Sequence, residues 1–209
     1  YLRYASTVDT EICEGTFRVQ EDYVRALAEA LAMDLGRPIN YALVDPAEIE
    51  HYCDTGGNGC YYDGKVYSVL PVHYHELAHA VAFAGGYVGP RAFQEGFAEA
   101  FSDGLDGQTF TRRDVGELLN SWTTDGSSYY SMALFVRFLI ERHSLEQLLD
   151  FMKATELHES YAGFAPMFAE LFGESLDSAV AGFLHYPSCS SWTNRIAVRE
   201  CDVAPEPWD

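Results

Sequence analysis

The hydrophobic pattern of the first 70 residues changes between strand-like and helical segments. Three short stretches rich in β-forming side chains predict strands, at residues 1–8, 39–44 and 65–70. Between the first two, residues 17–35 carry apolar side chains at helical spacing, namely Val24, Leu27, Leu31 and Leu35. Gly36 and Pro38 are expected to end this helix. A shorter helix is expected from Asp45 to His51, followed by a loop with two cysteines.

Beyond residue 71 the pattern is helical almost throughout. Apolar positions recur every three to four residues and predict helices at residues 91–102, 112–120, 127–142, 145–155, 160–172 and 174–185. Ser127 or Ser128 is expected to cap the most apolar of them. Ser144 with Gln147 forms a candidate capping box for the next helix. With no internal repeat and no obvious linker, we expect a single domain over residues 1–209. Its expected class is α+β, a small N-terminal mixed β-sheet followed by a mostly helical bundle.

The net charge of the chain excludes some classes of binding partner. Hydrophobic content of 48% and charged content of 22% are ordinary for a globular protein. The balance of 13 Lys and Arg against 32 Asp and Glu gives a net charge of −19. Such a chain repels phosphate backbones and anionic lipid, so we expect no nucleic-acid partner. No apolar run reaches the ~18 residues of a membrane span, so no membrane insertion is expected. The oligomeric state stays open.

The five cysteines predict disulfides and an oxidising compartment. Cys53 and Cys60 bracket a glycine-rich loop that could close easily, and Cys189 and Cys201 bracket a short segment near the C-terminus. Pairing in this way leaves Cys13 over, and other connectivities stay open. Zinc ligation by cysteines is the competing interpretation, but none of the five has CxxC spacing. We therefore expect a secreted protein, extracellular or periplasmic, although no signal-peptide pattern opens this sequence.

The segment His75-Glu76-Leu77-Ala78-His79 carries the clearest chemistry. On a helix, residues i and i+4 lie on one face, so both imidazoles could reach one metal ion. Glu76 is rotated by about 100° from His75, which suits it to hold a metal-activated water rather than to bind the metal. Chance would place this pattern on the order of 0.02 times in such a chain. The segment therefore predicts a metal site.

The helix around this motif is expected to be mostly buried. Pro71 suits a first helical turn, and Gly85 with Gly86 should end the helix. An apolar stripe runs between them, formed by Tyr74, Leu77, Ala78, Val81 and Ala84. Buried paired histidines need a partner, which argues against the alternative of two surface histidines. His73 is expected to point away from the pair.

A catalytic zinc takes three protein ligands and keeps a fourth position open, so a third ligand is needed. A third histidine in the pattern HExxHxxGxxH would require Gly at position 82 and His at position 85. The chain has Ala82 and Gly85, which excludes that class. Glu95, sixteen residues after His79, is the candidate instead, and Glu99 shares its helix face.

The face formed by Glu95 and Glu99 has two interpretations. The opposite face carries three phenylalanines, Phe93, Phe97 and Phe101. The two glutamates could therefore be the solvated side of an amphipathic helix. Their face also carries small residues that would let a second helix approach closely, Ala92, Ala98 and Ser102. With the histidine motif upstream, we predict Glu95 as the third ligand and Glu99 as the hydrogen-bond acceptor for the other ring nitrogen of a ligating histidine.

Together these motifs resemble those of the gluzincin metallopeptidases, the group that contains thermolysin and the leucotriene-hydrolase-like aminopeptidases. The first match is His75-Glu76-x-x-His79, and the second is Glu95-Gly96-Phe97-Ala98, similar to the E-G-x-A segment whose Glu completes the family's site. The segment from Tyr130 to Leu139 is similar to the aminopeptidase helix that begins with an oxyanion-stabilising Tyr. The aminopeptidases' Gly-x-Met-x-Asn segment is absent, which favours an endopeptidase.

The resemblance implies a zincin-like fold with one zinc ion per chain, bound by His75, His79 and Glu95. It also implies zinc-dependent hydrolysis of peptide bonds in a peptide or protein substrate, with Glu76 as the general base. Tyr130 is expected to stabilise the oxyanion. The alternatives for that role are Tyr129, His143 and His158.

The resemblance further implies how the site is built. The helix with the two histidines and the helix with Glu95 should pack together, and substrate should lie along the strand at residues 65–70. The alternative function is a non-catalytic zinc-binding or protein-interaction domain that keeps the gluzincin fold. It predicts an occluded fourth coordination position.

Overall fold

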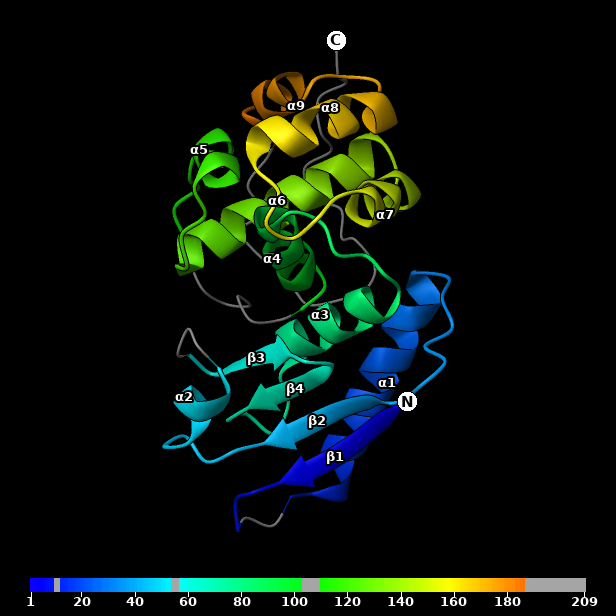
Figure 1. Cartoon of the computed structure of the whole chain (residues 1–209), viewed down its shortest axis with the longest axis vertical. Coiled ribbons are helices and arrows are strands. Elements are labelled where there is room, and N and C mark those ends of the chain that lie inside the picture. The colour runs from blue at the N-terminus through cyan, green and yellow to red at the C-terminus, as the bar shows by residue number, and fades with distance from the viewer. Residues whose placement is uncertain (10–11, 54–56, 103–109, 187–209) are drawn as a thin grey trace. The chain divides into compact units, whose positions relative to one another are not determined.

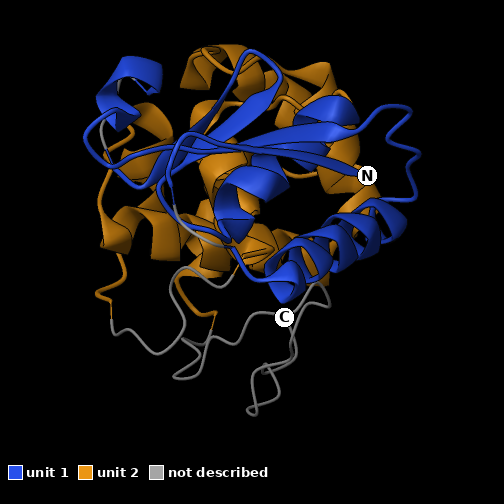
Figure 2. Cartoon of the chain, turned by 90° about the horizontal axis from the view of Figure 1, so that it is seen from below, with its two compact units in different colours: residues 1–85 blue, residues 86–209 orange. Residues whose placement is uncertain are grey.

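The computed structural model describes residues 1–9, 12–53, 57–102 and 110–186 (Figure 1). Its contacts divide the chain into two compact units, Tyr1–Gly85 and Gly86–Asp209, which Figure 2 colours separately. All described strands belong to the first unit, and the described part of the second unit is helical. The α+β class with a small mixed sheet is therefore confirmed. A single domain and a zincin-like fold stay predictions.

The first unit contains a four-stranded sheet with the strand order β1-β2-β4-β3. The strands are β1 (Leu2–Ser6), β2 (Ile39–Leu43), β3 (Gly59–Tyr62) and β4 (Lys65–Ser68). β2 runs parallel to both β1 and β4, whereas β3 is antiparallel to β4. The three strands expected from the sequence are present, each somewhat shorter than its apolar stretch.

β3 is a strand that the hydrophobic pattern does not predict. It is four residues long and begins at Gly59, inside the loop with the two cysteines. Asp63 and Gly64 have positive φ angles of 49° and 75°, and they form the two-residue turn between β3 and β4. β3 is therefore a strand because it pairs with β4 in a hairpin. Its own residues do not alternate between apolar and polar side chains.

The position of β4 corrects the expectation that substrate lies along residues 65–70. β4 is hydrogen-bonded to β2 on one side and to β3 on the other. Its backbone groups are thus engaged in the sheet and cannot pair with an extended peptide. The edges of this sheet are β1 and β3.

Three helices complete the first unit: α1 (Glu14–Ala30), α2 (Ile49–Tyr52) and α3 (Tyr74–Ala84). α1 ends earlier than expected because the chain turns at Ala32, where φ is 50°. Leu31 and Leu35 are buried nonetheless, so their apolar spacing continues beyond the helix. α3 begins three residues after Pro71, which precedes the helix rather than lying in its first turn.

Successive side chains of β4 point to opposite faces of the sheet, as in any β-strand. On one face Tyr67 stacks on Tyr52 of α2, with ring centroids 4.7 Å apart. On the other, Val66 is fully buried and pairs with Tyr61 of β3. The Tyr61 ring lies 5.2 Å from that of Phe83, so this face meets α3.

The second unit contains six described helices (Figure 1). They are α4 (Arg91–Ala100), α5 (Val115–Asn120), α6 (Gly126–Arg142), α7 (Leu145–Ala154), α8 (Tyr161–Phe172) and α9 (Leu176–Phe183). The helices expected here from the sequence are all present. The Ser144 hydroxyl accepts the backbone N–H of Gln147 at 3.1 Å, which confirms the predicted cap of α7.

Phenylalanine rings form the core of the second unit. One or more come from α4, α6, α7, α8 and α9, and all are buried: Phe93, Phe135, Phe138, Phe151, Phe164, Phe168 and Phe183. The Phe93 ring centroid lies 4.8 Å from that of Phe151 and 6.0 Å from that of Phe135. Edge-to-face and tilted pairs of this kind add to the free energy gained by burial.

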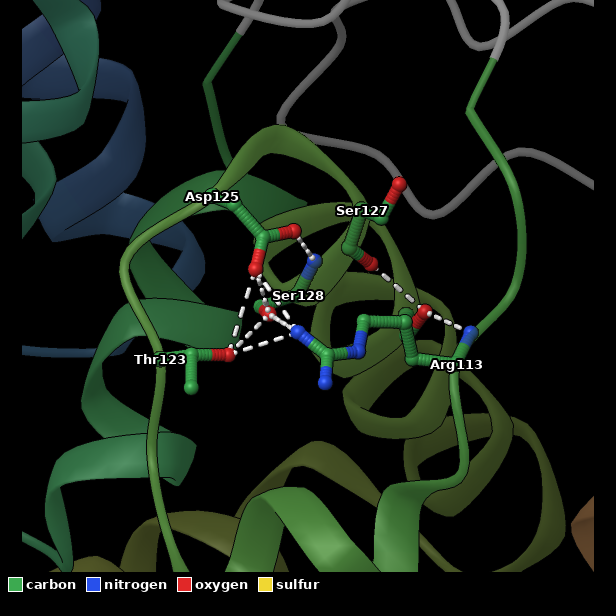
Figure 3. A network of polar contacts seen from close by, with 6 residues as sticks. Arg113, Thr123, Asp125, Ser127 and Ser128 are labelled. Atoms are coloured by element: carbon green, nitrogen blue, oxygen red, sulfur yellow. Dashed lines mark hydrogen bonds and ion pairs between the residues drawn. The ribbon is translucent and has the colours of Figure 1, made fainter.

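Asp125 caps α6, instead of the predicted Ser127 or Ser128 (Figure 3). Its carboxylate accepts a hydrogen bond from the backbone N–H of Ser128 at 3.0 Å and another from Nη1 of Arg113 at 2.7 Å. A capping residue needs an extended backbone, which Asp125 has, whereas both serines already belong to the helix. Desolvation opposes ionisation of Asp125, but its hydrogen bonds and the Arg113 guanidinium outweigh it and lower the pKa of this carboxyl.

Candidate metal site

The two histidines of the motif lie one turn apart on α3 and converge. Their Nε2 atoms are 3.1 Å apart, and the two rings are nearly perpendicular, with centroids separated by 4.8 Å. His79 is 8% exposed and His75 is half-buried. The i, i+4 relation predicted from the sequence therefore brings both imidazoles to one point.

The body of α3 is buried, as its sequence predicts. Leu77, Ala78 and Val81 are fully buried, although Ala84, the last residue of the expected stripe, is exposed. Glu76, next to the first histidine, is only 7% exposed. A carboxylate with so little access to water is unusual, since burial of a charge must be offset by nearby polar groups.

The two glutamates of α4 do not form a solvated face. The Glu95 side chain is 16% exposed and lies 3.9 Å from Nε of Arg91. Glu99 is 4% exposed. The small residues on the same face are buried as well, namely Ala92, Ala98 and Ser102. The low exposure of these side chains agrees with the interpretation in which another segment packs closely against this face of α4.

One ligand atom from each of His75, His79 and Glu95 lies within 4.8 Å of the others, so these residues could hold a metal ion. Ligand atoms ~2.0–2.2 Å from a tetrahedral ion are separated by roughly 3.3–3.5 Å. The 3.1 Å between the histidine nitrogens is close to that spacing. Two imidazoles and a carboxylate suit zinc and related divalent metals. His75, His79 and Glu95 are thus a candidate ligand set, and zinc as their metal stays a prediction.

The glycine after Glu95 has a packing role. A Cβ added to Gly96 would lie 2.7 Å from the carbonyl oxygen of Met132 in α6, which is closer than real Cβ atoms come. Only glycine therefore lets α4 approach α6 this closely. Ala98 on the same helix is fully buried. The small side chains of Gly96 and Ala98 thus allow α4 to pack closely within the second unit.

The candidates for the oxyanion role occupy different surroundings. Tyr130 is 9% exposed, with its ring 6.0 Å from that of Phe110, while Tyr129 meets Trp122 edge to face at 5.2 Å. His143 Nε2 lies 2.9 Å from the Glu174 carboxylate, and His158 is exposed. The roles of Tyr130 in catalysis and of Glu99 beside a ligand stay predictions, as does that of Glu76.

The expected disulfide between Cys53 and Cys60 is present, with Cα atoms 5.8 Å apart. It joins the end of α2 to β3, and such a bond is typical of an oxidising compartment. Cys13 is a free, exposed thiol. The predicted pair Cys189 and Cys201 lies outside the described residues.

The sequence was also compared with known proteins. No family model matches it, and the searches of curated proteins and of solved structures found no match. Among the residues that the structure describes, no helix is both long and apolar enough to cross a membrane.

Proposed function

We propose that this chain is a zinc-dependent endopeptidase in which His75, His79 and Glu95 bind one zinc ion. The observation that carries the proposal is the convergence of these three ligand atoms within 4.8 Å. Beside the first ligand stands a second acidic group, Glu76, held at 7% exposure on the same helix. A site made only to hold a metal would not need this buried carboxylate.

Zinc bound by three protein ligands supplies Lewis-acid activation of water and of the scissile carbonyl. Glu76 accepts the proton of the attacking water and transfers it to the amine that leaves. Leu77 and Ala80 beside it on α3 are buried, and Glu76 itself has little access to bulk water. Tyr130 donates its hydroxyl to the oxygen that gains negative charge. Glu99 accepts a hydrogen bond from a ligating imidazole and fixes its tautomer.

The proposed setting is outside the reducing cytosol. The bond between Cys53 and Cys60 would persist in a secreted, extracellular or periplasmic protein. The net charge of −19 fits a soluble enzyme that acts on peptides or proteins rather than on nucleic acid.

Replacing Glu76 by Gln tests the proposal directly. Glu76→Gln should keep zinc bound at one ion per chain, because the ligands are untouched, and should lower peptide hydrolysis by a factor of ~10³ or more. Metal content by elemental analysis and cleavage of an unstructured protein such as casein are the two measurements. Glu146→Gln, an exposed carboxylate in the first turn of α7, is the matched control and should cleave at the wild-type rate.

Each other outcome has a distinct meaning. Zinc binding with no hydrolysis by the wild-type chain favours the non-catalytic zinc-binding domain. A Glu76→Gln chain that cleaves at the wild-type rate contradicts the role of Glu76. No zinc in the wild type, and no difference on replacing His79 by Ala, contradicts the metal site itself.

A further inference from the structure

The turn between β4 and α3 is held by buried side chains from three elements of the first unit. Tyr41 of β2 donates its hydroxyl to the Leu70 carbonyl at 2.6 Å. Gln20 of α1 donates its side-chain amide to the next carbonyl, that of Pro71. Ser68, the last residue of β4, accepts the Leu70 N–H at 3.0 Å. All three side chains belong to buried residues. We call Gln20, Tyr41 and Ser68 the turn clamp.

His73 links the turn clamp to the start of α3. The Ser68 hydroxyl donates to the Asn58 carbonyl at 3.1 Å and lies 3.0 Å from Nδ1 of His73. Which of the two atoms donates in the contact with His73 depends on the tautomer of that ring. A Cβ added to Gly59 would lie 2.7 Å from this nitrogen. Only a glycine at position 59 of β3 therefore leaves space for the His73 ring. The ring of His73 is therefore fixed in orientation.

α3 needs such support because its first turn carries His75. First turns have backbone N–H groups without helical partners and open most easily. Four helices of the second unit have a side-chain cap, from Asp114, Asp125, Ser144 and Ser175. In the described residues α3 has no side-chain cap hydrogen bond. The turn clamp holds the backbone immediately before the helix instead.

The chemistry of Tyr41 suits a permanent hydrogen bond. Burial, and to a smaller extent the charge of Glu76, raise the pKa of the Tyr41 hydroxyl, while Ser68 opposes the shift. The hydroxyl therefore stays protonated at any physiological pH and can always donate to Leu70.

We propose that the turn clamp positions the metal ligands of α3. By fixing the carbonyls of Leu70 and Pro71 it fixes the first turn of the helix, and with it the direction of the His75 ring. The inference rests on the proposed zinc site. Groups hydrogen-bonded to the ligands themselves change metal affinity by about 10- to 100-fold in other sites, and we expect support one step further from the metal to act at the lower end of that range. Gln20, Tyr41 and Ser68 are thus positioning residues that do not touch the metal.

Two tyrosines of the same stacked pair provide the test. Tyr4 of β1 stacks on Tyr41 with ring centroids 5.2 Å apart, and within the described residues its buried hydroxyl has no hydrogen-bond partner. Tyr41→Phe removes the bond to Leu70, whereas Tyr4→Phe removes a hydroxyl that holds nothing. Zinc affinity, measured by competition with a chromogenic chelator, should fall about tenfold in Tyr41→Phe. It should be unchanged in Tyr4→Phe.

Further readouts separate positioning from general loss of structure. The visible absorption spectrum of the Co²⁺-substituted chain should change in Tyr41→Phe and not in Tyr4→Phe, with circular dichroism equal in both. Gln20→Met, which keeps the shape and removes the amide, should weaken zinc binding in the same way and replaces Tyr41→Phe if that variant does not fold. Equal zinc affinity in all variants overturns the turn clamp and leaves the zinc site standing. No zinc binding by the wild type overturns both.

Discussion

The two units place their polar groups differently. In the first unit, buried hydrogen bonds from Gln20, Tyr41 and Ser68 converge on one turn, immediately before the helix that carries the histidines. In the second, phenylalanine rings form most of the interior, buried polar side chains such as Ser131 and Arg137 lie among them, and a charged pair, Asp125 with Arg113, lies at a helix end, partly exposed.

We relate this difference to two tasks: buried hydrogen bonds position the backbone, and apolar packing stabilises the fold. A buried hydrogen bond has a preferred distance and direction, so it fixes the position of the backbone it holds. Apolar packing contributes more free energy but tolerates changes of shape more readily. We therefore expect changes in the second unit to act mainly on stability, and changes around the turn before α3 to act mainly on the metal site.

The largest expected effect is on stability, from opening the phenylalanine core. Phe168→Ala should lower the free energy of unfolding of the second unit by about 3–5 kcal/mol, because it removes a fully buried ring. All three tryptophans lie beyond residue 85, so tryptophan fluorescence during urea unfolding reports on this unit. Leu184→Ala, at a 68% exposed side chain, is the control and should change little. Equal loss of amide protection in β2, by hydrogen exchange, would break the comparison between the units.

A smaller effect is expected from the disulfide of the first unit. Replacing Cys53 and Cys60 by Ser should cost about 2–3 kcal/mol, since the bond closes a loop with a sequence separation of 7. The loss should be seen as faster amide exchange in β3 and β4. The tryptophan signal should move little, and Cys13→Ser, at an exposed thiol, should change neither. A fall in the tryptophan-monitored midpoint as large as that in the first unit would show that the two units unfold together.

The smallest effect is a pH dependence of the second unit. Hydrogen bonds from His143, Arg142 and Ser178 outweigh desolvation and lower the pKa of Glu174, and that of Asp125 is lowered as well. A carboxyl whose pKa is lower in the folded state stabilises that state at neutral pH. This contribution is lost as pH falls below the ordinary value of 4.5 for Glu and then 3.8 for Asp.

The tryptophan-monitored midpoint should therefore fall between pH 5 and pH 3. Asp125→Asn should reduce this fall and cost about 1 kcal/mol or less at pH 7, because the carboxylate is partly exposed and screened by solvent. An unchanged acid transition in Asp125→Asn would assign the pH dependence to Glu174 and other carboxyls.

Local patterns in the sequence determined much of this structure. The helices of the second unit follow from the spacing of apolar residues, because the helical period is a property of neighbouring positions. The convergence of His75 and His79 follows from the same period, and the loop between Cys53 and Cys60 is short enough to close on itself. Each of these features depends on residues fewer than ten positions apart.

Tertiary structure alone decided the rest. β3 exists because it pairs with β4, and Asp125 rather than a serine caps α6 because the backbone is extended there. The burial of Glu99, which a helical pattern also permits to be solvated, depends on what packs over it. The bonds from Gln20 and Tyr41 to the turn before α3 join residues 51 and 29 positions apart. No local pattern encodes such contacts, because the free energy that forms them arises only when distant segments are packed together.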